Sequence, residues 1–267
     1  ITSMIMPQIE SNQFSFGNFY ERRIRRLAPP LAPVTAFVVA FCFLFYPPDD
    51  FQHALKSVVA TLTYWSNWHF MYSSGYFSAP QDTIPLLHTW SLSIEEQYYI
   101  VFPALLVAAR RFGRVTALSA TTILFFTSLG YSYYSTLGGD PSAGYLDTFA
   151  RGWELLLGSI LAQMPKPKLS PATSTMFRTV GMTMMVAPAF YLDKSSTFPG
   201  LHALVPTLGT ALVIISNADA KHDPIHRAIS SAPAVYVGRI SYGLYLWHWP
   251  AIVFCRYLFV DAGPLEM

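Results

Sequence analysis

The most regular feature of the chain is a series of apolar stretches, each about as long as a bilayer is thick. A transmembrane helix needs roughly 20 mainly apolar residues. Pro and Gly interrupt several stretches, but neighbouring helices accommodate such residues inside a membrane. The pattern therefore predicts an all-α fold, a polytopic transmembrane helix bundle. Seven stretches qualify as spans: 29–46, 92–109, 115–134, 148–163, 175–192, 200–216 and 235–258.

Residues 53–72 are ambiguous, because His, Lys, Ser and Asn interrupt an otherwise apolar stretch. Cytoplasmic loops are enriched in Lys and Arg. If residues 53–72 do not cross the membrane, 13 of the 17 Lys and Arg residues fall on the inner side. If they do cross, that bias largely disappears, so we expect an outer-surface or re-entrant helix here. The exceptions to the bias are Lys56, Arg151, Lys194 and Arg256.

Composition points to the same class of protein. The chain has 267 residues and is 52% hydrophobic and 12% charged, whereas a soluble domain carries about 25% charged residues. No soluble domain or internal repeat is evident, so the sequence predicts one membrane domain over residues 1–267. The chain begins at Ile1, without an initiator Met, and stops directly after an apolar stretch. We therefore expect it to be a fragment, truncated at both ends.

Several functional classes find no support in the sequence. The net charge is +2 and no basic stripe with interleaved aromatics occurs, so nucleic-acid binding is not expected. Cys42 and Cys255 lie in apolar stretches and are typical of buried hydrophobic residues. His and Cys spacing does not match a zinc site, and no phosphate-binding glycine loop or serine-hydrolase motif is present. We expect no metal and no permanently bound cofactor.

A first cluster of candidate residues consists of four arginines at the inner end of the first span, Arg22, Arg23, Arg25 and Arg26. Spacings of three and four residues put Arg22, Arg25 and Arg26 near one helical face, with Arg23 adjacent. The cluster is either a positive-inside anchor or an anion site. Because the arginine fork matches phosphate and no lysine is present, the pattern favours the anion site.

A second cluster leads into the second span from the outer side and comprises His88, Trp90, Ser91, Glu95 and Glu96. Placing charge near lipid costs free energy. These residues are therefore either solvated at the membrane interface or kept because they form a functional site. Paired carboxylates at this position would orient a sugar hydroxyl or hold a buried arginine.

The third cluster is Asp147, Arg151 and Glu154, whose spacing places them on one face of a helix at 148–163. An arginine and a glutamate inside a membrane should face the bundle interior and pair there. The pair is either part of a substrate site or a structural ion pair that locks two helices. Gly152 and Gly158 would permit the close helix packing that both interpretations need.

The fourth cluster lies in the last span and contains Ser241, Tyr242, Tyr245 and His248. His248 is well inside the apolar stretch, so we expect it to be buried. It is either a hydrogen-bonded structural residue, with partners from neighbouring Tyr and Trp side chains, or a catalytic base.

Four blocks of the chain together resemble the acyltransferase-3 family of membrane-bound O-acyltransferases, which acetylate bacterial surface polysaccharides. The blocks occur in the order found in the family, and the second and fourth are the most specific. They are FYERRIRRLAPPL, PLLHTWSLSIEEQYYIVFPALL, DTFARGWELLLGSILA and GRISYGLYLWHWP.

The resemblance implies an enzyme of the bacterial inner membrane. It would move an acyl group, commonly acetyl from acetyl-CoA, from the cytoplasmic side to a hydroxyl of a surface or lipid-linked glycan outside. The Arg-x-x-Arg signature matches two overlapping pairs, Arg22 with Arg25 and Arg23 with Arg26, which would hold the CoA phosphates. Acyl-CoA, the glycan acceptor and membrane lipid would be its partners. The remaining candidates would be catalytic (Glu95, Glu96, His248) or would contact the acceptor (His88, Trp90, Arg151, Glu154, Tyr242).

The sequence also departs from the family pattern. The family's best candidate for the catalytic base is a histidine in a first span, and no residue of this chain matches it. We therefore expect the main catalytic histidine in a missing N-terminal span and expect the fragment alone to be inactive. The alternatives are a polytopic transporter, although no repeated halves are evident, and a non-catalytic membrane fragment.

Overall fold

The computed structural model describes residues 1–73, 84–138, 141–193, 199–216 and 224–259. Within these residues the chain forms α-helices, short 3₁₀ helices and turns, without a strand. This confirms the all-α prediction. The chain divides into two compact units, which we call unit 1 (residues 1–13 and 98–238) and unit 2 (residues 14–97 and 239–267).

Unit 2 is organised around one long helix, α2, which begins well before the predicted apolar span. Ser15 caps it, and the backbone N–H of Asn18 donates to Ser15 Oγ at 3.4 Å. Three prolines lie inside this helix, and each removes one helical amide donor. Unit 2 contains α2 (Phe16–Phe45), α3 (Pro48–Leu62), α4 (Ser66–Ser73), η2 (Leu87–Thr89), the start of α6 (Trp90–Arg110) and most of α14 (Ala232–Phe259).

Helix α3 folds back along the apolar stretch of α2. The two helices contribute buried residues to one hydrophobic cluster, among them Val38 of α2 and Val58 of α3. Residues 53–72 are therefore not one helix, because the chain turns between α3 and α4 and Tyr64 adopts a left-handed φ of 55°. Whether residues 53–72 lie at the outer surface, re-enter or cross the membrane stays a prediction.

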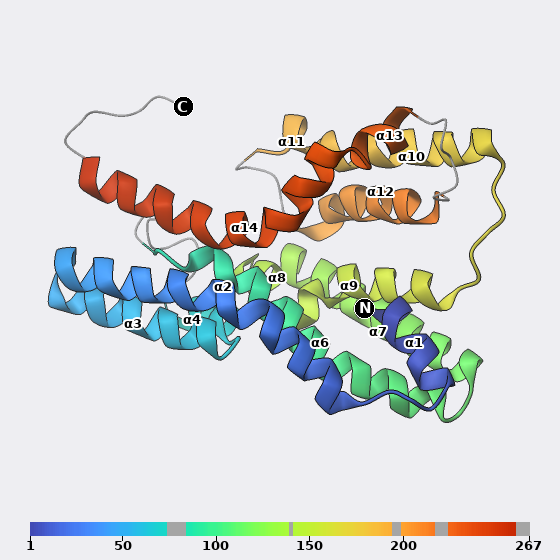
Figure 1. Cartoon of the computed structure of the whole chain (residues 1–267), viewed down its shortest axis with the longest axis horizontal. Helices are drawn as coiled ribbons and strands as arrows, with labels where there is room; N and C mark the ends of the chain where they lie inside the picture. The colour runs from blue at the N-terminus through green and yellow to red at the C-terminus, as the bar shows by residue number, and fades with distance from the viewer. Residues whose placement is uncertain (74–83, 139–140, 194–198, 217–223, 260–267) are drawn as a thin grey trace. The chain divides into compact units, whose positions relative to one another are not determined.

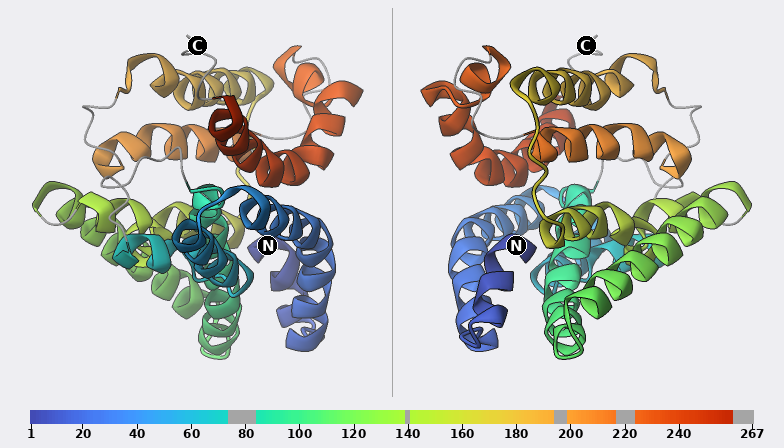
Figure 2. Two further views of the ribbon diagram at one scale, coloured as in Figure 1. Left: turned by 90° about the vertical axis from the view of Figure 1, so that its left-hand side faces the viewer. Right: turned by 90° about the vertical axis from the view of Figure 1, so that its right-hand side faces the viewer.

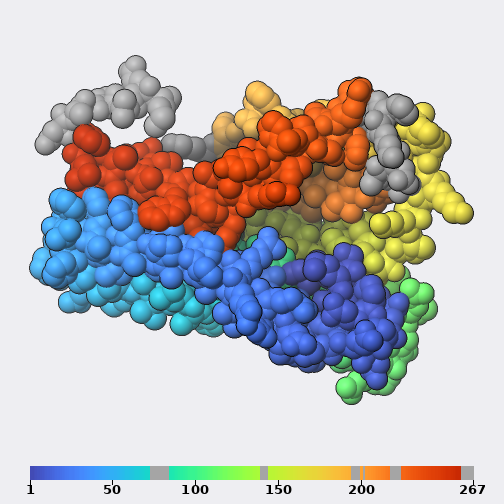
Figure 3. Space-filling view, in the orientation of Figure 1, coloured from blue at the N-terminus to red at the C-terminus, as the bar shows by residue number. Residues whose placement is uncertain are grey.

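Helix α14 completes unit 2 and runs parallel to α2, as Figures 1 and 3 show. The hydroxyl of Tyr242 donates to the carbonyl of Leu27 at 3.4 Å, and the hydroxyl of Tyr257 donates to the carbonyl of Phe45 at 2.6 Å. Between these points the ring of Phe41 stacks on that of Phe254, with centroids 3.8 Å apart, and Phe37 meets Phe254 edge to face. Aromatic contacts of this kind add to the stability that comes from area burial alone.

Two pairs of packed helices form the centre of unit 1, α7 with α9 and α10 with α12, and both pairs can be followed in Figure 2. Asp147 caps α9, accepting from the backbone N–H of Phe149 at 2.8 Å. Unit 1 contains α1 (Thr2–Glu10), the rest of α6, α7 (Arg114–Gly138), α8 (Pro141–Leu146), α9 (Thr148–Gln163), α10 (Pro171–Val186), α11 (Pro188–Tyr191), η3 (Gly200–Ala203), α12 (Leu204–Ile215), α13 (Pro224–Ile229) and the first turns of α14.

The predicted spans all fall on helices, but seven crossings stay a prediction. Among the described residues, two helices are long and apolar enough to cross a membrane, Phe16–Phe45 and Arg114–Gly138, and Leu204–Ile215 is a shorter apolar helix. Lys194 and the last residues, 260–267, lie outside the described residues.

Two glycines bring α10 and α12 into backbone contact. A Cβ added at Gly181 would lie 2.6 Å from the carbonyl oxygen of Gly209, and one added at Gly209 would lie 2.7 Å from that of Gly181. Membrane helices approach closely where small residues face each other. These glycines, rather than Gly152 and Gly158, are therefore the closest helix contact that the glycines of the described part of the chain provide.

We expect Gly209→Ala to destabilise unit 1 by about 1–3 kcal/mol, because backbone atoms must move to admit the methyl group. Gly130→Ala is the matched control, since a Cβ at this helical position meets nothing within 4 Å. Thermal unfolding of the purified chain in detergent measures both. Equal melting temperatures for the two variants would contradict the predicted close contact.

Candidate functional site

The first candidate site, in unit 2, centres on an ion pair between α2 and α6. Arg23 Nε donates to Glu96 Oε2 at 3.1 Å, and Arg23 Nη2 contacts Glu96 Oε1. Glu96 is 5% exposed, so its carboxylate depends on the arginine in place of water. Both carboxylate oxygens are engaged, which is the geometry that makes arginine pairs strong. Of the two interpretations of these glutamates, Glu96 matches the one in which a carboxylate holds an arginine, although Arg23 is partly buried, while Glu95 is exposed.

This contact corrects the predicted depths of the two residues. The sequence placed Arg23 at the inner mouth of the bundle and Glu96 at its outer end. Because the side chains of Arg23 and Glu96 are in direct contact, they lie at the same depth. One of them cannot be at the inner end of the bundle while the other is at the outer end. The error arose because charge counting assigns each loop to a side of the membrane without regard to the partner of each charge.

Gln97, directly after Glu96, fixes the turn between α3 and α4. Its side-chain nitrogen donates to the carbonyl of Tyr64 and to Asn67 Oδ1, both at 2.8 Å. The indole N–H of Trp68 donates to Gln97 Oε1 at 3.2 Å. The sequence analysis missed Gln97, although an amide in an apolar stretch was a usable signal.

A chain of hydroxyls continues this polar region towards the start of α6. Thr61 and Thr89 lie 2.9 Å apart, Thr89 donates to Ser66 at 3.1 Å, and Ser66 and Ser93 lie 2.7 Å apart, measured between side-chain oxygens. All four residues are buried. Satisfied networks of this kind rigidify their surroundings, so the start of α6 is held firmly against α3 and α4.

Tyr245 brings the second and fourth sequence blocks together. Its hydroxyl donates to the carbonyl of His88 at 2.6 Å and lies 3.0 Å from Ser91 Oγ. The ring of His88 meets those of Tyr245 and His248 nearly edge to face, with centroids 5.0 and 5.3 Å away. Within the described part of the chain, neither ring nitrogen of His88 has a partner with normal hydrogen-bond geometry. A ligand hydroxyl is one group that would satisfy them.

His248 differs from the sequence-based expectation, because it is exposed rather than buried. Its Nδ1 lies 2.7 Å from the carbonyl oxygen of Tyr245. A carbonyl only accepts hydrogen bonds, so this contact requires the proton on Nδ1. In the neutral ring Nε2 is then the unprotonated nitrogen, which is the form that accepts a proton from a substrate.

The other predicted residues of unit 2 divide by exposure. Arg22, Arg25 and Arg26 are exposed on α2, which matches their predicted shared face, and Arg25 pairs with Glu21 one turn away at 2.6 Å. Trp90 and Tyr242 are partly buried, and Ser241 is exposed.

The second candidate site, in unit 1, is the ion pair of α9. Arg151 Nη1 lies 3.0 Å from Glu154 Oε1, and the guanidinium sits 5.7 Å from the centroid of the Tyr145 ring. The pair joins two residues of one helix, so it does not itself lock two helices together. Asp147 is not part of this ion pair, since its carboxylate caps α9 and accepts from the hydroxyl of Tyr131 at 3.0 Å.

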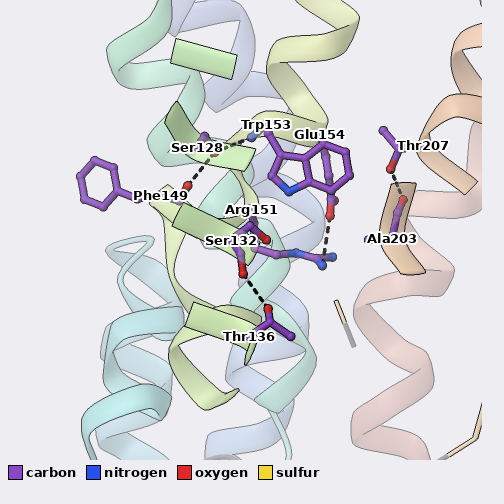
Figure 4. A network of polar contacts seen from close by, with 9 residues as sticks. All are labelled: Ser128, Ser132, Thr136, Phe149, Arg151, Trp153, Glu154, Ala203 and Thr207. Carbon is purple, nitrogen blue, oxygen red and sulfur yellow. Dashed lines mark hydrogen bonds and ion pairs between the residues drawn. The ribbon is translucent and has the colours of Figure 1, made fainter. Parts of the chain in front are cut away.

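A serine from α7 supports the same turn of α9, as Figure 4 shows. Ser128 Oγ donates to the carbonyl of Phe149 at 2.6 Å and accepts from the backbone N–H of Trp153 at 2.8 Å. That carbonyl and amide are i and i+4 and would otherwise bond each other. A Cβ at Gly152 would lie 3.4 Å from Ser128 Oγ, so glycine leaves room for this bridge beside Arg151.

Arg151 and Glu154 line a cavity of about 1110 Å³ inside unit 1. Its walls come from α1, α6, α9, α10, α12 and α13. Arg178 of α10, which the sequence analysis counted only as inner positive charge, lies in the wall and is 2% exposed. The sequence signal for it was a single arginine within an apolar helix.

We expect Arg23→Ala to cost about 3–5 kcal/mol of folding free energy, because it leaves the buried Glu96 carboxylate without its partner. Arg22→Ala, on the exposed face of the same helix, should change stability by less than about 0.5 kcal/mol. Chemical denaturation of both variants in detergent tests this. Similar losses in the two would show that the ion pair does not support the fold.

Histidine 88 should make stability depend on pH. Burial of the ring lowers the pKa of His88 from 6.5 to about 3, and the neighbouring His248 adds to this effect. The backbone of Leu246 acts in the opposite direction, through a contact that does not reach normal hydrogen-bond geometry. The unfolded chain takes up a proton near pH 6.5 that the folded chain refuses, so stability is full above pH 6.5 and falls as pH drops towards 3.

His88→Gln should therefore flatten the dependence of melting temperature on pH between about 6.5 and 4. His53→Gln, at an exposed position of α3, serves as the control and should keep the slope of the parent chain. Parallel slopes for His88→Gln and the parent would refute the assignment.

Comparison with known proteins identifies the family of this chain. The family model described as an acyltransferase domain, of the acyltransferase-3 type, matches residues 6–266. The chain is 32% identical over 226 residues to an uncharacterized protein of Haemophilus influenzae, covering 80% of this chain and 92% of that protein. No solved structure matches.

Two relatives carry functional names. The putative peptidoglycan O-acetyltransferase YrhL of Bacillus subtilis is 31% identical over 95% of this chain and 42% of its own length. The peptidoglycan O-acetyltransferase OatA of Listeria monocytogenes is 29% identical over 94% of this chain and 42% of its own. The chain thus spans less than half the length of these two relatives. By its match over residues 6–266, this chain belongs to the acyltransferase-3 family of integral membrane proteins.

Proposed function

We propose that the chain is the membrane part of a bacterial O-acyltransferase. It would take an acyl group, in the simplest case acetyl, from acyl-CoA at the cytoplasmic side of the inner membrane. It would transfer that group to a hydroxyl of a surface or lipid-linked polysaccharide on the outer side. The observation that carries the proposal is the family match over residues 6–266, with relatives named as O-acetyltransferases.

In this proposal the exposed arginines of α2 bind the phosphates of CoA. Arg22 and Arg26 are exposed on one face of α2, where their guanidinium groups would meet a dianionic phosphate, and Arg25 beside them pairs with Glu21 at the surface. Arg23 is engaged with Glu96, so in this proposal it positions α2 against α6 instead of binding the donor.

His248 is the residue of this chain best placed to act as a base. A sugar hydroxyl is a poor nucleophile, and a positioned base that removes its proton contributes typically 10²–10⁴-fold. With Nδ1 bonded to the carbonyl of Tyr245, Nε2 is the ring nitrogen of His248 left for the acceptor hydroxyl, and the ring of His88 stands beside it. The thioester carbonyl would also need a donor as negative charge develops.

The proposal is tested by acyl transfer in membrane vesicles. The gene is expressed both as this chain and together with its flanking coding sequence, and label from radiolabelled acetyl-CoA is followed into glycan. We expect label with the longer form. Solute flux without acyl transfer would instead support the transporter alternative, and a folded protein that does neither would support the inactive-fragment alternative.

The donor site is tested in the form that transfers label. Arg26→Ala should raise KM for acetyl-CoA about tenfold, the effect of losing one charge-assisted hydrogen bond, with a smaller change in kcat. Lys56→Ala, on α3 of the same unit, is the charge-matched control. An unchanged KM in Arg26→Ala would exclude this arginine from donor binding.

A further inference from the structure

The wall of the unit 1 cavity has a graded chemistry along α9. Arg151, Glu154, Gly158 and Ala162 all line the cavity, and their spacing of three, four and four residues puts them on one helical face. The charged pair occupies one end of this face and two small residues occupy the other. Polar and apolar parts of a ligand would therefore lie in a fixed order along the helix.

Glycine 158 keeps the apolar end open. A Cβ added at Gly158 would meet nothing within 4 Å, so this glycine does not serve helix packing as the sequence suggested. On the facing wall, Thr207 and Thr210 of α12 donate to the carbonyls of Ala203 and Pro206, at 2.7 and 2.9 Å. Their hydroxyl protons are taken up within their own helix, so this part of the α12 wall offers a ligand mainly methyl groups. Figure 4 shows Thr207 facing the α9 ion pair.

The charged end suits a neutral polyol better than an anion. The guanidinium of Arg151 supplies donors only and the carboxylate of Glu154 supplies acceptors only, and they stand 3.0 Å apart. Neighbouring sugar hydroxyls both donate and accept, so they match this pair. A phosphate would be attracted by Arg151 and repelled by Glu154. Two further cations line the cavity on other segments: the buried Arg178 of α10, and Lys166, which lies beyond the end of α9.

The arrangement of charge also argues for a ligand. Ionisable residues are costly inside a membrane and usually face a cavity or a substrate path. Arg151 and Glu154 are one turn apart in one helix, and their side chains are 13% and 26% exposed, so the pair remains partly accessible from the cavity. A cavity of about 1110 Å³ exceeds the roughly 300–1,000 Å³ typical of small-ligand sites. It has room for a sugar and a length of apolar chain.

We propose that this cavity binds the acceptor as an amphiphile, a saccharide head at Arg151 and Glu154 with an apolar chain running past Gly158. The proposal rests on the proposed function and deepens it, because it makes a lipid-linked saccharide, not free polymer, the substrate of the site.

Binding is measured first, without catalysis, as the rise in melting temperature of the purified chain in lipid nanodiscs. Methyl, octyl and dodecyl β-glucoside are added at concentrations that leave the discs intact. We expect apparent affinity to rise with alkyl length, and octyl glucoside to bind more tightly than octyl phosphate. Equal affinities for the three glucosides, or preference for octyl phosphate, would overturn the proposal.

Two variants locate the site. Gly158→Leu should weaken dodecyl glucoside about tenfold and leave methyl glucoside unchanged, because leucine fills the apolar end alone. Glu154→Gln should weaken all three glucosides by similar factors. Gly130→Leu, where a Cβ also meets nothing within 4 Å, is the control and should change none. Loss of chain-length dependence in the control as well, or an unaltered dependence in Gly158→Leu, would refute the placement.

Acetyl transfer to the same glucosides separates this inference from the proposed function. Transfer from radiolabelled acetyl-CoA whose KM falls with alkyl length, and loses that trend in Gly158→Leu, would support both. Binding with the expected trend but no transfer would refute the proposed function and keep the amphiphile site. Transfer with a KM that ignores alkyl length would refute the amphiphile site and keep the acyltransferase.

Discussion

The buried carboxylate of Glu96 is the constraint on which unit 2 depends. A charge removed from water must find its partner inside the protein, and Arg23 is that partner. Their contact sets the register of α2 against α6, and the adjacent Gln97 fixes the α3–α4 turn from the same helix. Tyr242 and Tyr257 then tie α14 to α2 at two levels. These contacts also fix the positions of the exposed arginines of α2, of His88 and of the start of α6.

Unit 1 uses charge in the opposite way. Its ion pair, Arg151 with Glu154, lies within α9 and faces a cavity, so it leaves the helix contacts to other residues. Gly181 and Gly209 provide the close approach of α10 and α12, and packing of this kind needs no polar group. The Arg23–Glu96 pair therefore joins two helices, whereas the Arg151–Glu154 pair faces a cavity. In the sequence both pairs are charges in apolar surroundings.

Family membership and geometry together narrow the chemistry. O-acyl transfer needs a donor site, an acceptor site and a base, and the described residues supply a candidate for each. In the proposed function the exposed arginines of α2 bind phosphate, the α9 cavity binds a polyol with an apolar chain, and His248 presents Nε2 to the acceptor. The three assignments use different residues, so an experiment can refute one of them and leave the other two standing.

The sequence by itself determined the helical class, the places of the long apolar stretches and the motifs that identify the family, because apolar length and residue spacing are local properties. It also indicated that Arg22, Arg25 and Arg26 share a face, and it offered an arginine partner as one of two roles for the glutamates at the start of the second span. Only the tertiary structure decided which glutamate and which arginine pair, that His248 is exposed, and that Gly158 opens a cavity. Each of these depends on which helices lie side by side, and hydrophobic pattern fixes the face of a helix without naming its neighbour.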